Sequence, residues 1–326
     1  MATSAPTAGA AAPELSAQQP RSLWADAIHR LLRNRAAVAG VCVVLIYILI
    51  ALFAPLLAPK NPVEQTARNS LRPPVWVTDN PNRMPNPANL LGTDSNGRDI
   101  LSRLIFGTRV SLIVGVVPQL IILGLGVTVG LVSGFNGGWI DNLLMRITEI
   151  VAAFPDLLFI ITLTVAFRDT LFGKALGGLL LIFTALAAVS WTGMARLVRG
   201  QVLSLKEKEF VEAARALGIP TGQILARHIL PNTMAPIIVS VSFSIPGLII
   251  SEAILTFLGV GMRPSVDLAN PLPTSLGQMM QEGFSNLSSG PWMLLFPVAM
   301  ISSLVLAFTF VGDGLRDALD PRDREG

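Results

Sequence analysis

Six long apolar runs limit what this chain can fold into. About 20 apolar residues in a helix, at 1.5 Å rise each, cover the roughly 30 Å hydrocarbon core of a bilayer. Only 14% of the residues are charged, whereas a soluble domain carries about 25%. The sequence therefore predicts an all-α membrane protein with six transmembrane helices and both termini on one side. The runs lie at approximately 36–58, 109–134, 148–167, 175–196, 236–260 and 291–312.

Basic residues predict the orientation of these helices, because Lys and Arg near span ends are retained in the cytoplasm. With the N-terminus inside, 14 of the 24 Lys and Arg residues fall on the inside and 10 on the outside. We therefore expect both termini to be cytoplasmic. Arginines also precede the first apolar run directly, after a long polar stretch. This order predicts a membrane anchor that stays attached and not a cleaved secretory signal.

The runs divide the chain into five segments. Residues 1–22, rich in Ala, Pro, Ser, Thr and Gln, are expected to form a disordered tail. The loop at 59–107 is dense in proline and asparagine, so we expect an extended extracytoplasmic cap packed over the outer face. The other segments are a cytoplasmic lead-in with the first transmembrane helix (23–58), a membrane core (108–313) with a polar cytoplasmic loop at 200–235, and a cytoplasmic tail (314–326).

The cap loop ends in LLGTDSNGRDILSRLIFGTRVSL, a stretch rich in turn formers. A Ca²⁺ loop needs glycine at the sixth position from its first Asp, but Gly97 is at the fourth position from Asp94. We expect instead a turn at Asn96 and Gly97, with Asp99 or Asp94 capping a short helix that leads into the second span. Direct ligand contact by these residues is the alternative.

Glycines and prolines mark the predicted spans. Gly126, Gly130 and Gly134 recur every four residues in the second span, which makes one smooth helix face for close packing. The helix that packs on this face can belong to the same subunit or to a second one, and the glycine spacing does not distinguish the two. Prolines predict kinks within three spans, at positions 118, 155 and 246.

Few ionisable residues lie at membrane depth. Asp156 follows Pro155, and Glu252 lies in the fifth span. Charged groups there are costly and face a cavity, a partner helix or water. A candidate substrate path consists of Gln119, Ser190, Thr192 and Glu252, with hydrogen-bonded packing as the alternative role for each.

The sequence contains no recognisable catalytic, nucleotide or metal site. No stretch reads GxxxxGK[ST], HExxH or GxSxG. His29 and His228 have no metal-ligand partner at suitable spacing, and Cys42 is the single cysteine. We therefore expect no enzyme activity, no metal and no cofactor bound by this chain. Uphill transport would then take its energy from an ion gradient or from a partner.

A polar stretch between the fourth and fifth spans, EAARALGIPTGQILARHILP at 212–231, is predicted to be helix, turn, helix. Glu212 can pair with Lys208 and Arg215 at helical spacing. The first helix should show one apolar face at i, i+3, i+4 and i+7, formed by Phe210, Ala213, Ala214 and Leu217.

Its second half contains the turn. Gly218 suits the left-handed position that ends a helix, and Pro220 prevents simple continuation. Thr221 is positioned to cap a second short helix to about Ile229, which Pro231 should close. By geometry alone, the pair could seat in another protein or lie on lipid headgroups as an amphipathic hairpin.

This stretch resembles the EAA signature of permease subunits of binding-protein-dependent ABC importers: E-A-A, three residues, G, nine residues, an aliphatic residue, one residue, L-P. The departure is His228 at the aliphatic position. RHILPN, the end of the cap loop, FLGVG and GDGLRDALDPR are similar to the dipeptide, oligopeptide and nickel branch. The resemblance covers about residues 30 to 322. The matching positions are Glu212, Ala213, Ala214, Gly218, His228, Leu230 and Pro231.

The resemblance implies a type I ABC importer permease in a prokaryotic cytoplasmic membrane. It implies a homologous second permease, one or two ABC ATPase subunits that bind ATP and Mg²⁺, an extracytoplasmic solute-binding protein and no nucleic acid. The implied cargo is di- or oligopeptides, with nickel complexes, opines or sugars as alternatives. The residues implied to couple the chain to the ATPase are Glu212, Ala213, Ala214, Gly218, Ile219, Pro220, His228, Leu230 and Pro231.

Two other classes are weighed against this one. Ion-coupled secondary transporters carry ionisable groups or broken spans in paired halves, and no clear internal repeat occurs here. A membrane scaffold or an intramembrane enzyme is the third class, and an enzyme would need a reactive pair that the sequence does not contain. Retention of an ATPase subunit by the intact loop discriminates among them.

Overall fold

The computed structural model describes residues 23–78 and 84–319, and the predicted tail at 1–22 lies outside them. In these described ranges the fold is helical, and the one bridge between extended residues joins Thr93 to Asp99. The helices are α1 (Leu23–Arg33), α2 (Arg35–Leu52), α3 (Ala54–Leu57), η1 (Ala67–Asn69), α4 (Ile100–Asn136), α5 (Gly138–Ala152), α6 (Asp156–Phe167), α7 (Leu171–Lys174), η2 (Ala175–Gly178), α8 (Leu179–Leu205), α9 (Glu209–Ala216), α10 (Thr221–Ile224), η3 (Leu225–Ile229), α11 (Leu230–Phe257), α12 (Leu276–Ser285) and α13 (Trp292–Leu319).

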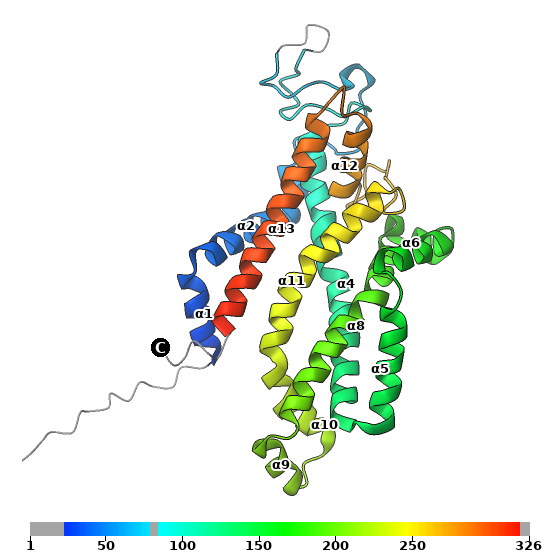
Figure 1. Cartoon of the computed structure of the whole chain (residues 1–326). Helices are drawn as coiled ribbons and strands as arrows, with labels where there is room; N and C mark the ends of the chain where they lie inside the picture. The colour runs from blue at the N-terminus through cyan, green and yellow to red at the C-terminus, as the bar shows by residue number, and fades with distance from the viewer. Residues whose placement is uncertain (1–22, 79–83, 320–326) are drawn as a thin grey trace, which may run out of the picture.

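Five helical stretches in the described residues are long and apolar enough to cross a membrane, and a bent pair makes up to six. Figure 1 shows them as an elongated bundle, with the cap at one end and α9 and α10 at the other. The last turns of α13 pack against α1, so the two ends of the described chain lie on one side. The five stretches are Arg35–Leu52, Ile100–Asn136, Leu171–Leu205, Thr221–Phe257 and Trp292–Leu319.

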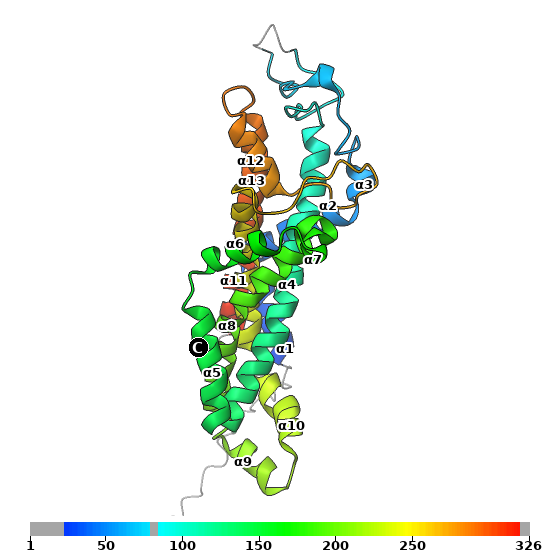
Figure 2. The same ribbon diagram turned by 90° about the vertical axis from the view of Figure 1, so that its right-hand side faces the viewer.

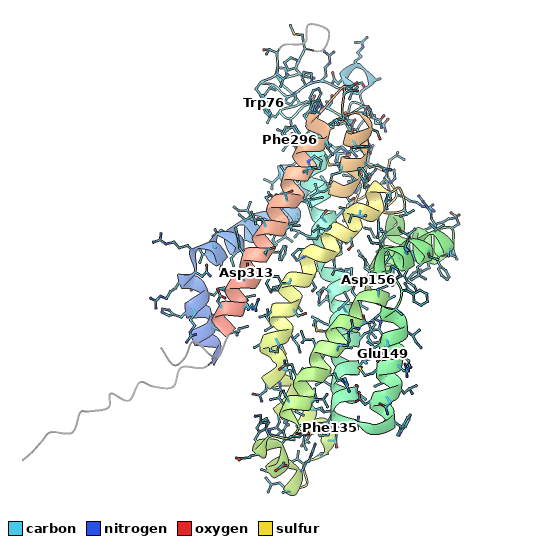
Figure 3. All side chains as sticks on the ribbon, viewed as in Figure 1. Trp76, Phe135, Glu149, Asp156, Phe296 and Asp313 are labelled. Carbon is cyan, nitrogen blue, oxygen red and sulfur yellow. The ribbon has the colours of Figure 1, made fainter. Side chains whose placement is uncertain are left out.

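The third span differs from its prediction as a continuous run at 148–167. It consists of α5 and α6, which meet at an angle of 82°. Pro155 explains the break, because it lacks an N–H and pushes the preceding Phe154 out of the helical region. Asp156 is exposed at the first position of α6, just after the break (Figure 3). A carboxylate is favoured there by the positive end of the helix dipole.

Glycines decide the packing of α4 against α8. A Cβ atom added at Gly126 would lie 2.6 Å from Cβ of Met194, and one at Gly134 would lie 2.8 Å from Cβ of Val202. The smooth face predicted from the four-residue spacing therefore packs within this chain, against its own α8. The stretch Leu171–Leu205, which contains α8, is the most enclosed of the five spans, with 56% of its most apolar residues buried against 22% for α2.

We expect Gly130→Val to destabilise the protein by roughly 1–3 kcal/mol, the usual cost of overpacking a tight core. A Cβ atom there would lie 2.7 Å from the carbonyl oxygen of Ala195 and 2.7 Å from Cβ of Val198. The control is Gly124→Val, on the same helix, where nothing lies within 4 Å. Thermal unfolding followed by circular dichroism in mild detergent should show a lower Tm for Gly130→Val alone. Equal Tm values for the two variants would contradict this packing.

The helix that begins at Thr221, inside the polar loop, runs without interruption to Phe257, so the prediction that Pro231 closes a short helix is wrong. The reason is a π-helical turn over Leu225–Ile229, in which the N–H of Leu230 donates to the carbonyl of Leu225. Such a turn adds a residue to the helix and allows Pro231 to follow at the start of α11.

The described cap residues, 59–78 and 84–99, lie beyond the outer end of α4 (Figure 2). Trp76 contacts Phe296 at the start of α13 edge to face, with ring centroids 6.2 Å apart (Figure 3). The backbone N–H of Lys60 donates to Ser102 at 3.1 Å. Helix α4 begins at Ile100, inside the stretch that the sequence assigns to the cap loop, and runs unbroken into the span.

Candidate functional site: the polar loop and the two ion clusters

The polar loop is a bent helix pair at one end of the bundle. Gly218 has φ +74°, its N–H donates to Arg215, and the N–H of Ile219 donates to Ala214 at 3.1 Å. This pattern ends α9 in the left-handed conformation that the sequence predicts. The predicted cap at Thr221 is wrong, because Thr221 is the first residue of α10, follows Pro220, and makes no side-chain cap.

The apolar residues of α9 lie on two sides of the helix and do not form the one face that the sequence predicts. Val211 and Ala214 are buried and join the main core. Phe210 and Leu217 point outward, with 41% and 80% of their surface exposed. The prediction of a single face formed by Phe210, Ala213, Ala214 and Leu217 is therefore wrong. Helix α9 rests on the bundle through Val211 and Ala214, and Ala213 also faces outward.

Charged residues of α9 make different contacts from those predicted. The guanidinium of Arg215 lies 5.0 Å from the ring centroid of Phe135, in the last turn of α4. No ion pair joins Glu212 to Lys208 or Arg215 in the part of the chain that the structure describes, and Glu212 is exposed. Phe135 thus anchors the loop through Arg215, and Figure 3 shows it at the polar-loop end of the bundle. No sequence spacing links these two elements.

The remaining candidate coupling residues lie in the same end of the molecule. Pro220 and Pro231 are exposed, while Ile219 and Leu230 are half-buried. His228, the departure from the aliphatic position, is half-buried in the π-helical turn, and its carbonyl accepts a hydrogen bond of 2.6 Å from the side chain of Asn232. All nine sequence-predicted loop residues therefore lie at this end of the molecule, with Ala214 buried and the other eight exposed or half-buried.

A bidentate ion pair fastens the polar-loop end of the bundle. Arg199 of α8 donates through Nε and Nη2 to the two carboxylate oxygens of Asp141 in α5, each at 2.7 Å. Ser133 of α4 also donates to Asp141. Three helices thus meet at one carboxylate, next to a cavity of about 510 Å³ between α5 and α8. The sequence analysis missed this pair, which joins residues 58 apart.

The candidate path residues fall into two groups. Ser190 lines a cavity of about 300 Å³ between α4, α8 and α11, and Ser244 lines the same cavity. Gln119 is buried, and its Oε1 accepts a hydrogen bond of 2.6 Å from Ser244. Ser240, Ser244 and Ser251 recur on one face of α11, a periodicity that the sequence contains and the sequence analysis did not use.

The other two candidates lie outside that cavity lining. The hydroxyl of Thr192 donates to Val189 in its own helix at 3.1 Å. Glu252 is completely buried, its Oε1 accepts from Thr256 at 2.8 Å, and Oε2 has no partner among the described residues. The structure therefore places Ser190 in the cavity lining, connects Gln119 to that lining through Ser244, and gives Thr192 and Glu252 neither position.

A buried ion cluster joins the cap to the bundle at the outer end. Arg103 of α4 is 1% exposed and contacts Asp94 and Glu282 through Nη1, each at 2.5 Å. Arg98 bridges the same two carboxylates at 2.6 and 2.8 Å. Burial raises the pKa of Glu282, but the two arginines outweigh burial, so the pKa lies below its ordinary value of 4.5. The sequence analysis missed this cluster.

The turn before α4 agrees with its structural prediction. Asp94 accepts backbone hydrogen bonds from Asn96 and Arg98 at 2.8 and 2.9 Å, and Gly97 has φ +74°. Asp99 caps α4 by accepting from the N–H of Ser102 at 2.8 Å. The carboxylates of Asp94 and Asp99 therefore accept hydrogen bonds from the protein's own N–H groups, as the prediction of a turn and a helix cap expects.

Comparisons with known proteins agree with this architecture. The family described as "Binding-protein-dependent transport system inner membrane component" matches residues 126–325, and the family described as "N-terminal TM domain of oligopeptide transport permease C" matches residues 22–74. The oligopeptide transport system permease protein OppC of Escherichia coli K12 is 41% identical, over 93% of both chains. That of Haemophilus influenzae is 40% identical over 93% of this chain and 90% of its own.

A dipeptide transport system permease protein DppC from Bacillus subtilis is 39% identical over 92% of this chain and 86% of its own. Among solved structures, a chain of the MetNI methionine ABC transporter in an inward-facing conformation has a TM-score of 0.55 and 17% identity. The match covers 68% of this chain and 98% of that one. At this identity the likeness concerns the fold alone, which is that of an ABC importer permease.

Proposed function

The chain belongs to the family of binding-protein-dependent transport system inner membrane components, and on that premise we propose that it is the peptide-carrying permease subunit of an ATP-driven importer. The 40% and 41% identity to two oligopeptide permeases, over nearly whole chains, supports peptides as cargo. Nickel complexes, opines and sugars are the competing cargo within the same architecture. The protein is a multi-pass component of the inner membrane.

One observation carries the proposed coupling to an ATPase: apolar side chains are exposed on a bent helix pair beyond the membrane-spanning part of the bundle. Leu217 is 80% exposed and adjoins Gly218, while Val211 and Ala214 hold α9 on the core from the other side. Exposed apolar side chains beside polar ones are typical of a protein interface. The loop 212–231 is thus the segment through which this chain contacts a partner subunit.

That partner supplies the nucleotide chemistry. The sequence contains no GxxxxGK[ST] stretch to cradle phosphates. ATP and Mg²⁺ therefore belong to one or two ATPase subunits, and this chain hydrolyses nothing itself. A second, homologous permease completes the pathway, and an extracytoplasmic binding protein delivers cargo to the capped side.

We assign the cargo path to the cavity between α4, α8 and α11. Its small and hydroxyl-bearing lining supports this role, because Ser190, Ser240 and Ser251 can exchange hydrogen bonds with a moving peptide backbone. Gln119 orients Ser244 by accepting a hydrogen bond from its hydroxyl group. Thr192 and Glu252 support the helices that form the path.

Co-purification tests the coupling. We expect the full chain, produced with its transporter subunits and extracted in mild detergent, to retain an ATPase subunit. Leu217→Glu should reduce that retention at least tenfold, about 1.4 kcal/mol, because it places a charge in the apolar contact. The control is Leu90→Glu, since Leu90 is 51% exposed in the cap. An unchanged complex with Leu217→Glu, or no ATPase with the intact chain, would reject the coupling role.

A further inference from the structure

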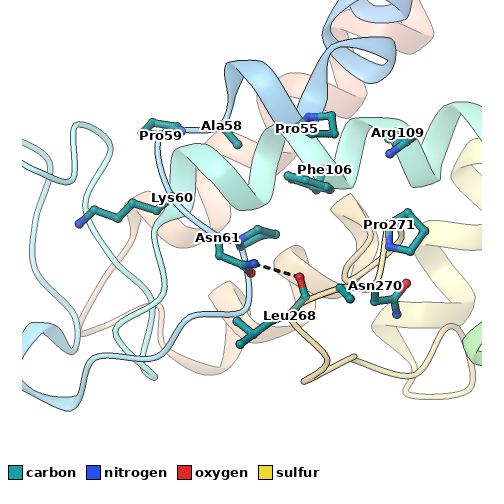
Figure 4. Close-up of a pocket in the computed structure, with 12 residues that line it drawn as sticks. Pro55, Ala58, Pro59, Lys60, Asn61, Phe106, Arg109, Leu268, Asn270 and Pro271 are labelled. Carbon is teal, nitrogen blue, oxygen red and sulfur yellow. Dashed lines mark hydrogen bonds between the residues drawn. The ribbon is translucent and has the colours of Figure 1, made fainter.

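A third cavity, of about 510 Å³, lies at the outer side of the bundle (Figure 4). Its walls are the chain from Pro55 to Pro62, the α4 residues Phe106 and Arg109, and the loop from Leu268 to Pro271. One hydrogen bond joins two of these walls, from Nδ2 of Asn61 to the carbonyl of Leu268 at 3.0 Å. The cavity is therefore enclosed by three segments that are distant in sequence.

The cavity is lined by the cationic residues Lys60 and Arg109 and by no acidic one, and the ammonium of Lys60 points away from Arg109 (Figure 4). Arg109 is half-buried and has no ion pair in the described ranges of the chain, whereas Arg98, Arg103 and Arg199 each contact a carboxylate. Lys60 donates to the neutral side chain of Asn89. A guanidinium that is partly removed from water favours an anionic partner, so the lining is suited to an anion.

The depth of the cavity indicates where the anion comes from. Phe106 packs with Ala54 and Ala58, which places this part of α4 level with the outer end of the first span. Leu56 of α3 follows the lining residue Pro55 in the chain and is 82% exposed, and Leu52 at the end of α2 is 64% exposed. Apolar side chains facing acyl chains, with a cation just beyond them, match the boundary between lipid tails and headgroups.

We propose that this cavity binds the phosphate of an outer-leaflet phospholipid, with Arg109 as its principal contact. Guanidinium groups bind phosphate through paired N–H donors, and Arg109 supplies such a group at this cavity. The acyl chains lie along the exposed leucines at the end of α2 and on α3. The bound lipid fastens the start of the cap loop to the 268–271 loop across the same cavity. This assignment does not depend on which cargo the transporter carries.

The test uses the complete transporter, delipidated in detergent and then supplied with phosphatidylglycerol. Native mass spectrometry counts the lipid retained per complex, and thermal unfolding measures the gain in Tm. We expect Arg109→Gln to retain at least fivefold less lipid and to lose the lipid-dependent Tm gain. Arg109→Lys should keep part of both. The control is Arg68→Gln, which removes an equal charge from an exposed position of the cap, outside the cavity.

Two further additions identify the ligand. Diacylglycerol, which lacks the phosphate, should give no Arg109-dependent gain, and inorganic phosphate alone should give much less than the lipid. Equal lipid retention by the wild type and Arg109→Gln overturns the proposal. So does a gain that inorganic phosphate reproduces in full, because the site would then bind free phosphate. If Arg109→Gln does not assemble, lipid retention is compared between Arg109→Lys and the wild type in the same titration.

Discussion

Gly218→Val is expected to leave the protein in the membrane and to lower ATP-dependent cargo uptake at least tenfold. Gly218 has φ +74° at the corner of the loop, and a β-branched residue is strained there. A Cβ atom at this position would meet nothing within 4 Å, so the effect comes from the backbone alone. The strain turns α10 away from α9 and misaligns the surface that we propose docks on the ATPase. ATP hydrolysis should then no longer respond to cargo-loaded binding protein.

Two control variants separate backbone strain from added bulk. Gly218→Asn should keep most of the uptake, because Asn tolerates the left-handed region. Gly124→Val adds the same side chain in α4, outside the loop, where nothing lies within 4 Å and φ is not positive. It should transport normally. Uptake and ATPase rates in proteoliposomes measure both effects, and normal uptake by correctly inserted Gly218→Val would refute the coupling role of the corner.

Arg103→Met should destabilise the outer end of the molecule by roughly 3–5 kcal/mol, the cost of removing one member of a buried ion cluster. Arg103 is 1% exposed and contacts both Asp94 and Glu282. Its loss leaves two carboxylates near each other with only Arg98 between them. The melting temperature of the purified complex should fall, and the cap should become sensitive to limited proteolysis.

The matched control is Arg146→Met, because Arg146 forms an ion pair whose two side chains are 75% and 62% exposed. Exposed pairs contribute little, so its melting temperature should not change. Acid gives a second measurement. Because the pKa of Glu282 is lowered on folding, its contribution is present above the ordinary value of 4.5 and is lost as the pH falls through the lower folded value. A cap that resists protease equally in wild type and Arg103→Met would contradict the role of the cluster.

Features that depend on neighbouring residues follow from the sequence. Asp99 caps α4, and Gly218 ends α9, because each conformation is set within one turn of helix. The spans follow from apolar length, which a bilayer converts directly into helix. Even here a local signal can be misjudged: Pro155 breaks the third span completely, whereas Pro231 is accommodated by a π-helical turn.

By itself, therefore, the sequence determined an all-α membrane protein with a bent polar loop, since lipid and local backbone geometry leave few alternatives. Only the tertiary structure decided that the glycine face of α4 meets α8, and that α9 buries Val211 while Leu217 stays exposed. It also decided the pairs Asp141 with Arg199 and Arg103 with Glu282, which join residues 58 and 179 positions apart. Such contacts depend on how the helices cross. Helical periodicity predicts which face of a helix is apolar, but it does not predict which other helix packs against that face.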